Sequence, residues 1–228
     1  GDRVALTRPG YPAYRNILAS LGCQVVELAC GPAERFQPSV EMLERAHAAA
    51  PLAGLVVASP ANPTGTMIAP EHVAQLAAWC RDHEVRLVSD EIYHGITDHT
   101  IAASCAWEHD REAIVISSFS KYWGMTGWRL GWSLVPADLV AAYDSLAGNF
   151  TLCPPVPAQH AAIAAFTEES YREADAAVAS FADARAIVLA ALDDLGWTGV
   201  APADGAFYVY AGIGGQLGPH PDSESWCE

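Results

Sequence analysis

One apolar run constrains the fold of this chain more than any other stretch. Residues 53–59 read Ala-Gly-Leu-Val-Val-Ala-Ser, without a charged side chain and without alternation of polar and apolar positions. A run of this kind is typical of a strand that is buried on both faces, as in a parallel sheet covered by helices. It ends at residues 60–65, Pro-Ala-Asn-Pro-Thr-Gly, which form turns. We therefore expect an α/β fold with a mostly parallel central sheet flanked by helices.

The segments around this run alternate between strand and helix patterns. Strands are expected at 4–7, 24–28, 85–90, 113–117 and 129–135, and helices at 11–21, at 38–49 and from residue 70. The helix that begins at Pro70 carries Val73, Leu76 and Cys80 at helical spacing. Alternation of this kind favours an open sheet, in which ligands bind beyond the carboxyl ends of the strands.

Three polar residues follow predicted strands within a few positions, namely Asn62, Asp90 and Lys121. We expect them to converge in one crevice, because the carboxyl ends of parallel strands lie at one edge of a sheet. Lys121 stands between Ser118 and Arg129. A lysine amine can form a Schiff base with the aldehyde of pyridoxal phosphate, and hydroxyl groups and a fixed cation can hold its phosphate. The stretch around Lys121 therefore predicts a pyridoxal-phosphate site.

The motifs around these residues resemble those of the class I and II aminotransferases, the fold type I group of pyridoxal-phosphate enzymes. Residues 118–131, Ser-Phe-Ser-Lys-Tyr-Trp-Gly-Met-Thr-Gly-Trp-Arg-Leu-Gly, fit the family's lysine signature at every constrained position. Residues 61–65, 90–93 and 205–208 also look like family motifs, in the family's order. The resemblance covers nearly the whole chain. It implies the fold type I large domain followed by the start of a small C-terminal domain.

The resemblance implies catalytic roles for Lys121, Asp90 and Tyr93. Lys121 matches the Schiff-base lysine, which also transfers the proton of the substrate α-carbon. Asp90 matches the carboxylate that faces the pyridine nitrogen, where opposite charges about 4 Å apart are worth roughly 4 kcal/mol at an effective dielectric constant of 20. Tyr93 matches the tyrosine that reaches the cofactor's phenolic oxygen, and Asn62 the asparagine that donates to that oxygen and contacts the substrate carboxylate.

Three further residues are implied to bind the cofactor. Ser118 and Arg129 resemble the phosphate ligands, and a guanidinium suits this role because its planar fork holds two phosphate oxygens and stays charged. Tyr11 falls where the family has an aromatic residue over the pyridine ring. Purely structural roles stay open for two of these residues, since Asp90 could cap a helix and Tyr93 could be a core aromatic residue.

The expected reaction is ping-pong transfer of an amino group from an amino acid to a 2-oxo acid. A β-elimination (carbon-sulfur) lyase on the same fold is an alternative, because it would share the cofactor residues. A second alternative is a non-catalytic effector domain of a transcription regulator. The substrate cannot be read from the sequence, because specificity depends on pocket shape and on side chains in segments that family members carry beyond this chain. No arginine of the chain stands at the family's substrate-carboxylate position; Arg172 and Arg185 are expected to be solvated on a long helix.

Composition argues against several other classes. Twelve Lys and Arg residues against 27 Asp and Glu residues give a net charge of −15, which disfavours nucleic acid and anionic membranes as partners. No apolar run reaches membrane-spanning length and residues 1–6 do not resemble a signal peptide, so we expect a cytoplasmic protein. Six cysteines without a C-x-x-C pair predict neither a metal site nor a disulfide framework; we expect reduced, mostly buried thiols.

The second half of the chain changes to helical patterns. Helices are expected at 137–146, 157–166 and 170–195, followed by the first strands of a second domain at 197–210. We therefore predict a cofactor-binding large domain at 1–167, and a connecting helix with part of a small domain at 168–228. Family members carry further residues at both ends, so the chain is expected to be a fragment of a protein that forms a homodimer at full length.

Overall fold

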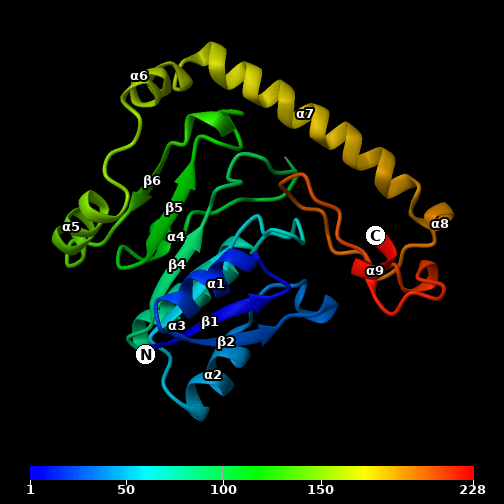
Figure 1. Cartoon of the computed structure of the whole chain (residues 1–228), viewed down its shortest axis with the longest axis horizontal. Helices are drawn as coiled ribbons and strands as arrows, with labels where there is room; N and C mark the ends of the chain where they lie inside the picture. The colour runs from blue at the N-terminus through cyan, green and yellow to red at the C-terminus, as the bar shows by residue number, and fades with distance from the viewer. Residues whose placement is uncertain (99) are drawn as a thin grey trace.

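A six-stranded sheet forms the centre of the molecule. The structure is a computed structural model that describes residues 1–98 and 100–228. The strands are β1 (Arg3–Arg8), β2 (Gln24–Ala29), β3 (Gly54–Ala58), β4 (Arg86–Asp90), β5 (Ile114–Ser118) and β6 (Gly131–Leu134), in the order β2-β1-β3-β4-β5-β6 (Figure 1). Strands β1 to β5 pair in parallel, and β6 runs antiparallel to β5. The prediction of a mostly parallel α/β sheet is confirmed.

The apolar run forms β3, which lies between β1 and β4. Leu55 of β3 is in register with Ala5 of β1 on one side and with Leu87 of β4 on the other. All three side chains are buried, and Leu55 has no exposed surface. Full burial of a leucine contributes roughly 1.5–3 kcal/mol, so this row accounts for the absence of polar residues along β3.

The helices between the strands supply the rest of this core. They are α1 (Pro12–Ser20), α2 (Val40–Ala49), α3 (Pro70–Asp82) and the short α4 (Ala106–His109), with a 3-10 turn at Pro32–Glu34. The side chain of Ser39 caps α2 by accepting the N–H of Met42, and Pro70 occupies the first turn of α3. Leu43 of α2 and Leu76 of α3 are buried in the same cluster as β3. Helices α1, α2 and α3 lie where the sequence predicts them, whereas α4 was not predicted.

The chain beyond β6 is mainly helical. It contains α5 (Val140–Phe150), α6 (Val156–Ala165), α7 (Glu168–Ala190), α8 (Leu192–Leu195) and α9 (Ser223–Cys227), with 3-10 turns at Thr126–Trp128 and Gly214–Gln216. Helix α7 passes over the sheet from α6 towards the C-terminal segment (Figure 1). The predicted helix at 170–195 is confirmed, with a break at Ala191. Although α7 begins beside the predicted boundary at 167/168, the division into two domains stays a prediction. No helix within residues 1–98 and 100–228 has the length and hydrophobicity needed to cross a bilayer.

Two expectations from the sequence are wrong in detail, and the first concerns the strands expected at 197–210. Residues 197–210 were expected to begin a new sheet, but the described residues there form no strand and make isolated pairings such as that of Thr198 with Gly212. Pro202 lacks an N–H donor, and Ala206 has a φ of 54°, which turns the chain out of an extended conformation. The isolated pairings are therefore not extended into a β-ladder.

The thiols are the second correction. All six cysteines are free, but only Cys30 and Cys80 are buried, while Cys153 and Cys227 are exposed. The difference arises because Cys153 follows α5 and Cys227 ends α9, which both lie outside the strand-centred core. Burial raises the pKa of Cys30 to about 11 and that of Cys80 to about 12, so these two thiols are poor nucleophiles.

Candidate functional site

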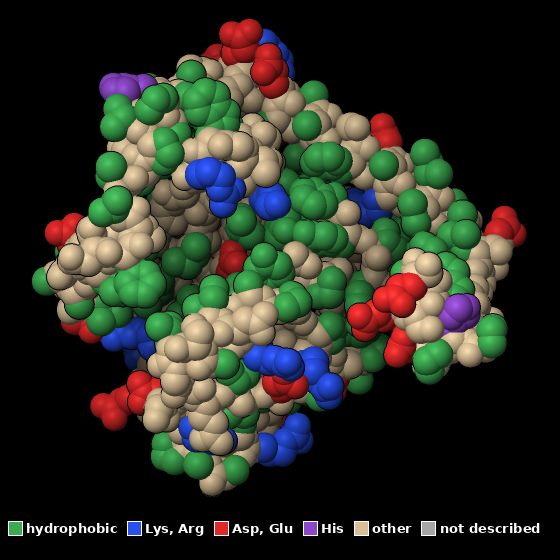
Figure 2. Space-filling view, viewed as in Figure 1, with side chains coloured by type: hydrophobic (Ala, Val, Ile, Leu, Met, Phe, Trp, Pro, Cys, Tyr) green, Lys and Arg blue, Asp and Glu red, His purple; other side chains and the backbone are tan. Residues whose placement is uncertain are grey.

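A cavity of about 280 Å³ lies beyond the carboxyl ends of β1, β3, β4 and β5. In the space-filling view, the face seen in Figure 1 is hollowed beside the sheet and bordered by hydrophobic side chains (Figure 2). All seven predicted site residues line the cavity: Tyr11, Asn62, Asp90, Tyr93, Ser118, Lys121 and Arg129. Tyr14, Ile92, Ser120, Thr126 and Tyr208 line it with them. The parallel strands thus bring together residues that are more than a hundred positions apart.

Asp90 is the last residue of β4. One carboxylate oxygen, Oδ1, accepts the N–H of Ile92 at 3.1 Å, and the other, Oδ2, accepts the hydroxyl of Tyr14. Burial raises the pKa of Asp90, and these two hydrogen bonds lower it without offsetting the burial. A carboxylate that has lost hydration in this way gains free energy from a cation beside it, which fits a protonated ring nitrogen in the cavity.

Tyr14 is a site residue that the sequence reasoning missed. It lies on α1, three positions after Tyr11, and the two rings pack edge to face with centroids 5.5 Å apart. Burial and the neighbouring Asp90 charge raise the pKa of Tyr14 well above its usual value, so its hydroxyl keeps the proton that it donates. The signal was present in the sequence, because residues three apart at a helix start share a face.

The hydroxyl of Tyr93 lies at the side of the cavity formed by Asn62 and Tyr208. Tyr93 is 5% exposed, and its hydroxyl oxygen is 2.5 Å from that of Tyr208. Burial raises the pKa of Tyr93 well above its usual range; the contact with Tyr208 raises it further, and a hydrogen bond from Asn62 lowers it. Asn62 and Tyr93 therefore lie within hydrogen-bonding distance of each other at the cavity, and their common oxygen partner stays a prediction.

Lys121 is the only lysine of the 228 residues. Its Nζ lies 5.7 Å from the ring centroid of Tyr93 and 5.8 Å from that of Phe207. The ion pairs found among the described residues involve arginines and one histidine, and none involves Lys121. The amine thus stands among aromatic rings and hydroxyls, where no carboxylate holds it in a salt bridge.

The edge of the cavity beside Lys121, here called the lip, contains the hydroxyl groups of Ser118, Ser120 and Thr126 and the guanidinium of Arg129. The Oγ of Ser118 accepts the N–H of Ser120 at 3.0 Å, and the hydroxyl of Thr126 donates to the Ser120 carbonyl at 3.0 Å. Arg129 is exposed and has a φ of 52°, which is uncommon for a residue with a side chain. Backbone strain of this kind persists where the surroundings impose it, often at ligand sites. The Ser118 hydroxyl donates to the Leu130 carbonyl at 3.1 Å and Arg129 Nη1 donates to the Thr126 carbonyl at 3.0 Å. The guanidinium of Arg129 carries further N–H groups, which suit an anion such as phosphate.

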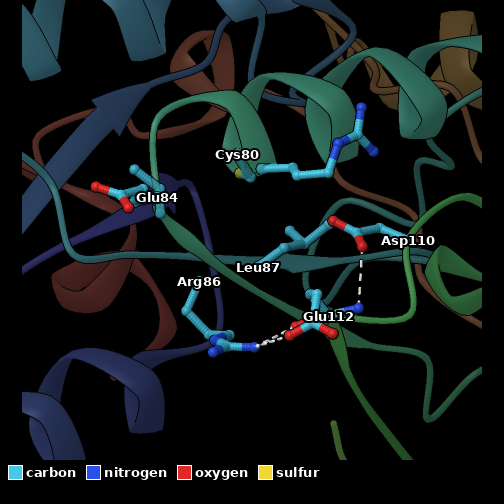
Figure 3. A pocket seen from close by; sticks show the side chains of 8 residues that line it. Cys80, Glu84, Arg86, Leu87, Asp110 and Glu112 are labelled. Atoms are coloured by element: carbon cyan, nitrogen blue, oxygen red, sulfur yellow. Dashed lines mark hydrogen bonds and ion pairs between the residues drawn. The ribbon is translucent and has the colours of Figure 1, made fainter. Parts of the chain in front are cut away.

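A second depression lies at the opposite edge of the sheet, near the start of β4 (Figure 3). Arg86 points there towards Glu112, with Nη1 3.4 Å from the carboxylate, and its other nitrogen lies 2.9 Å from Asp138. Cys80 lines the depression, but its raised pKa keeps it protonated. Arg81 also lines the depression and lies 3.7 Å from the Asp82 carboxylate, so both of its arginines are paired and its thiol is a poor nucleophile.

The two arginines of α7 differ in their exposure to solvent. Arg172 is exposed, as expected. The expectation that Arg185 is solvated is wrong, because its side chain is 17% exposed and its guanidinium lies 3.0 Å from the Asp98 carboxylate. Helix α7 passes over the loop that contains Asp98, which explains the burial.

Comparisons with known proteins relate this chain to one family. The family model described as aminotransferase class I and II matches residues 1–225. A valine–pyruvate aminotransferase from Mycobacterium tuberculosis is 57% identical over 214 residues, which cover 93% of this chain and 55% of that protein. An aspartate/prephenate aminotransferase from Thermus thermophilus is 34% identical over 214 residues, which cover 92% of this chain and 54% of that protein. The chain thus spans about half the length of these curated relatives.

The fold comparison leads to the same family. The crystal structure of an aminotransferase from Mycobacterium tuberculosis superposes with a TM-score of 0.94 at 55% sequence identity. The match covers all of this chain and 58% of that one. From its family-model match, its relatives and its fold, this chain belongs to the class I and II aminotransferases.

Proposed function

We propose that the protein containing this chain is a pyridoxal-phosphate-dependent aminotransferase, which transfers an amino group from an amino acid to a 2-oxo acid. One observation carries the proposal: the amine of Lys121, the carboxylate of Asp90 and the phenol of Tyr93 face a single cavity at the carboxyl edge of the sheet. The family implies this cofactor. When bound, pyridoxal phosphate supplies an aldehyde that takes up the amino group and a ring that accepts electrons.

The residues of the cavity fit the parts of that cofactor. Lys121 Nζ is the lysine amine available to bind the aldehyde and then to accept and return the proton of the substrate α-carbon. Asp90, which has lost hydration, would hold the positive charge of the ring nitrogen. Tyr93 and Asn62 would donate to the phenolic oxygen beside the aldehyde. These four side chains reach the cavity from three strand ends: Asn62 follows β3, Asp90 and Tyr93 lie at the end of β4, and Lys121 follows β5.

The remaining residues suit the phosphate and the ring face. Ser118 and Arg129 would bind the phosphate, and Ser120 and Thr126 line the same lip. Tyr11 is 45% exposed and contacts Tyr14 edge to face, which leaves room for a ring to stack on it.

A single substitution tests the proposal. Lys121→Ala should abolish covalent cofactor binding and lower transamination about 10³-fold or more, because the proton-transferring amine is lost. Borohydride reduction of the wild-type protein followed by peptide mass spectrometry should place the cofactor mass on Lys121. Arg172→Ala, an exposed change on α7, is the control and should behave as wild type. Unchanged transamination in Lys121→Ala would disprove the mechanism.

We further propose valine as an amino donor and pyruvate as an acceptor, because the relative at 57% identity is named a valine–pyruvate aminotransferase. The relative at 34% identity is named for aspartate and prephenate, so a dicarboxylic donor is the competing outcome. A panel of amino donors assayed with pyruvate and with 2-oxoglutarate separates the two. Release of pyruvate and ammonia without any acceptor would favour the β-elimination lyase instead.

We also propose a cytoplasmic homodimer without nucleic-acid or membrane partners. Helix α5 has no buried residue, and it exposes Val140, Tyr143, Leu146 and Phe150, which supports coverage by more polypeptide. The net charge of −15 and the scattered cysteines support the partner and compartment assignments. Light scattering of the purified protein tests the dimer, and a monomer would contradict it. Cell fractionation tests the compartment.

A further inference from the structure

The segment 204–208 is held tightly against the loops at the carboxyl edge of the sheet. The N–H of Gly205 donates to the Gly65 carbonyl at 2.9 Å, and that of Ala206 donates to the Ile96 carbonyl at 2.7 Å. The carboxylate of Asp204 accepts the N–H of Met67 at 3.0 Å. Two loops of the sheet layer, those that follow β3 and β4, therefore fix this segment, although it begins more than 110 positions after the last residue of β4.

The turn at Gly205 and Ala206 has little conformational freedom, because it packs closely against the neighbouring loops. A Cβ on Gly205 would lie 2.6 Å from Pro60 Cγ and 2.8 Å from the Ile96 carbonyl oxygen, so the glycine is sterically required. Ala206 has a φ of 54°, a left-handed conformation that L-residues seldom adopt. This turn brings the ring of Phe207 to 5.8 Å from Lys121 Nζ and places Tyr208 in the cavity lining.

The Tyr208 hydroxyl meets the Tyr93 hydroxyl at 2.5 Å, and the two rings pack edge to face with centroids 5.5 Å apart. Each hydroxyl has one proton to donate and can accept two hydrogen bonds. The Asn62 amide lowers the pKa of Tyr93, as a donor to its oxygen does, whereas the Tyr208 contact raises it, as an acceptor of the Tyr93 proton does. Because Tyr93 has one proton, once a ligand in the cavity accepts that proton the bond between the two hydroxyls persists only with Tyr208 as its donor.

We propose that Tyr208 is a positioning residue, which donates to Tyr93 and thereby commits the Tyr93 hydroxyl to donate to the ligand beside Lys121. The inference rests on the proposed function, in which that ligand atom is the cofactor's phenolic oxygen. A chain of hydroxyls strengthens the last donor, because each hydrogen bond polarises the next. The C-terminal segment would thus tune the protonation of the bound cofactor through Tyr93.

The test is a pH titration of the absorbance of the protein with bound pyridoxal phosphate. A weaker Tyr93 donor stabilises the unprotonated form of the bound cofactor less, so Tyr208→Phe should raise the titration midpoint by about 0.5–1 pH unit. The phenylalanine keeps the ring packing. Tyr210→Phe is the matched control, because that ring packs on Phe36 with centroids 5.8 Å apart and does not line the cavity.

A double variant distinguishes positioning from a general structural effect. Because Tyr208 acts through Tyr93, the Tyr93→Phe/Tyr208→Phe protein should have the same midpoint as Tyr93→Phe alone. An unshifted midpoint in Tyr208→Phe, or additive shifts in the double variant, would overturn the inference. A wild-type protein without a cofactor absorbance band would overturn the proposed function and this inference together, so the two failures are distinguishable.

Discussion

The buried charge of Asp90 lowers the folding stability of the protein and favours binding of a cation in the cavity. Its side chain is partly buried at the end of β4, and burial raises its pKa above the usual value of 3.8. Folding is therefore favoured most when Asp90 is protonated, below the pKa of the unfolded chain. That contribution is lost as the pH rises through the folded-state pKa. At neutral pH the charge costs stability until a cation in the cavity offsets it.

Asp90→Asn should remove this pH dependence. In the cofactor-free protein we expect the stability of the variant relative to wild type to increase as the pH rises from below 3.8 towards 7, because only the wild type loses the contribution of the protonated carboxyl group. Cofactor affinity should fall at the same time. Urea denaturation at several pH values measures the first effect and fluorescence titration the second. A constant stability difference across this range would refute the assignment.

Tyr14→Phe should have the opposite effect on stability. It removes the hydroxyl that donates to the Asp90 carboxylate and leaves that oxygen without this donor. We expect a loss of about 1–3 kcal/mol at pH 7 and a smaller loss near pH 3, where Asp90 is neutral. Tyr143→Phe is the control, because its hydroxyl accepts from Ser133 at an exposed position. Equal losses at both pH values would argue against an electrostatic role for Tyr14.

At the scale of elements, the strands and helices of the first 167 residues follow the sequence pattern closely. Strand β3 was predictable because a run of apolar residues is stable only when both faces are covered, and α3 because Pro70 and the spacing of Val73 and Leu76 mark a helix. The segment 197–210 was not predictable in the same way. Its conformation depends on contacts with loops far away in the sequence, including the close approach of Gly205 to Pro60.

Two glycine substitutions separate local propensity from this tertiary contact. Gly205→Ala should destabilise the protein by about 1–3 kcal/mol, because its Cβ has no room beside Pro60 and Ile96. Gly148→Ala, inside α5 with nothing within 4 Å, should stabilise it by roughly 0.5–1 kcal/mol. Thermal unfolding of both variants measures the difference. A neutral Gly205→Ala would mean that the segment does not pack as described.

At the scale of the whole molecule, ion pairs join the C-terminal part of the chain to the sheet layer. Arg35 lies 2.7 Å from Asp204, whose side chain is 7% exposed, and Arg185 of α7 lies 3.0 Å from Asp98. Asp204 also accepts the Met67 N–H. A buried carboxylate with two donors fixes the position of the segment that carries Tyr208, so stability and site geometry are coupled here.

The substitution Asp204→Ala tests this coupling between folding stability and the position of the segment that carries Tyr208. The change leaves the buried Met67 N–H without its acceptor, which costs about 1–3 kcal/mol, and it should speed proteolytic cleavage after residue 196. Asp204→Asn keeps an acceptor oxygen and should lose less. Limited proteolysis with mass spectrometry and urea denaturation check both statements. Equal behaviour of the two variants would assign the effect to the lost charge of Asp204 alone.

The sequence by itself predicted the mostly parallel sheet and the strand-end residues Asn62, Asp90 and Lys121 with the neighbouring Ser118 and Arg129, because apolar periodicity and strand-end motifs are local signals. The family resemblance added Tyr11 and Tyr93 to make seven site residues. The roles of those seven residues remain predictions. Only the tertiary structure decided that Tyr14 donates to Asp90, that Arg185 is paired with Asp98, and that Tyr208 meets Tyr93. These contacts join segments up to 115 positions apart. Hydrogen bonds and charge pairs at that separation depend on how the folded loops pack, and local propensity along the chain does not encode them.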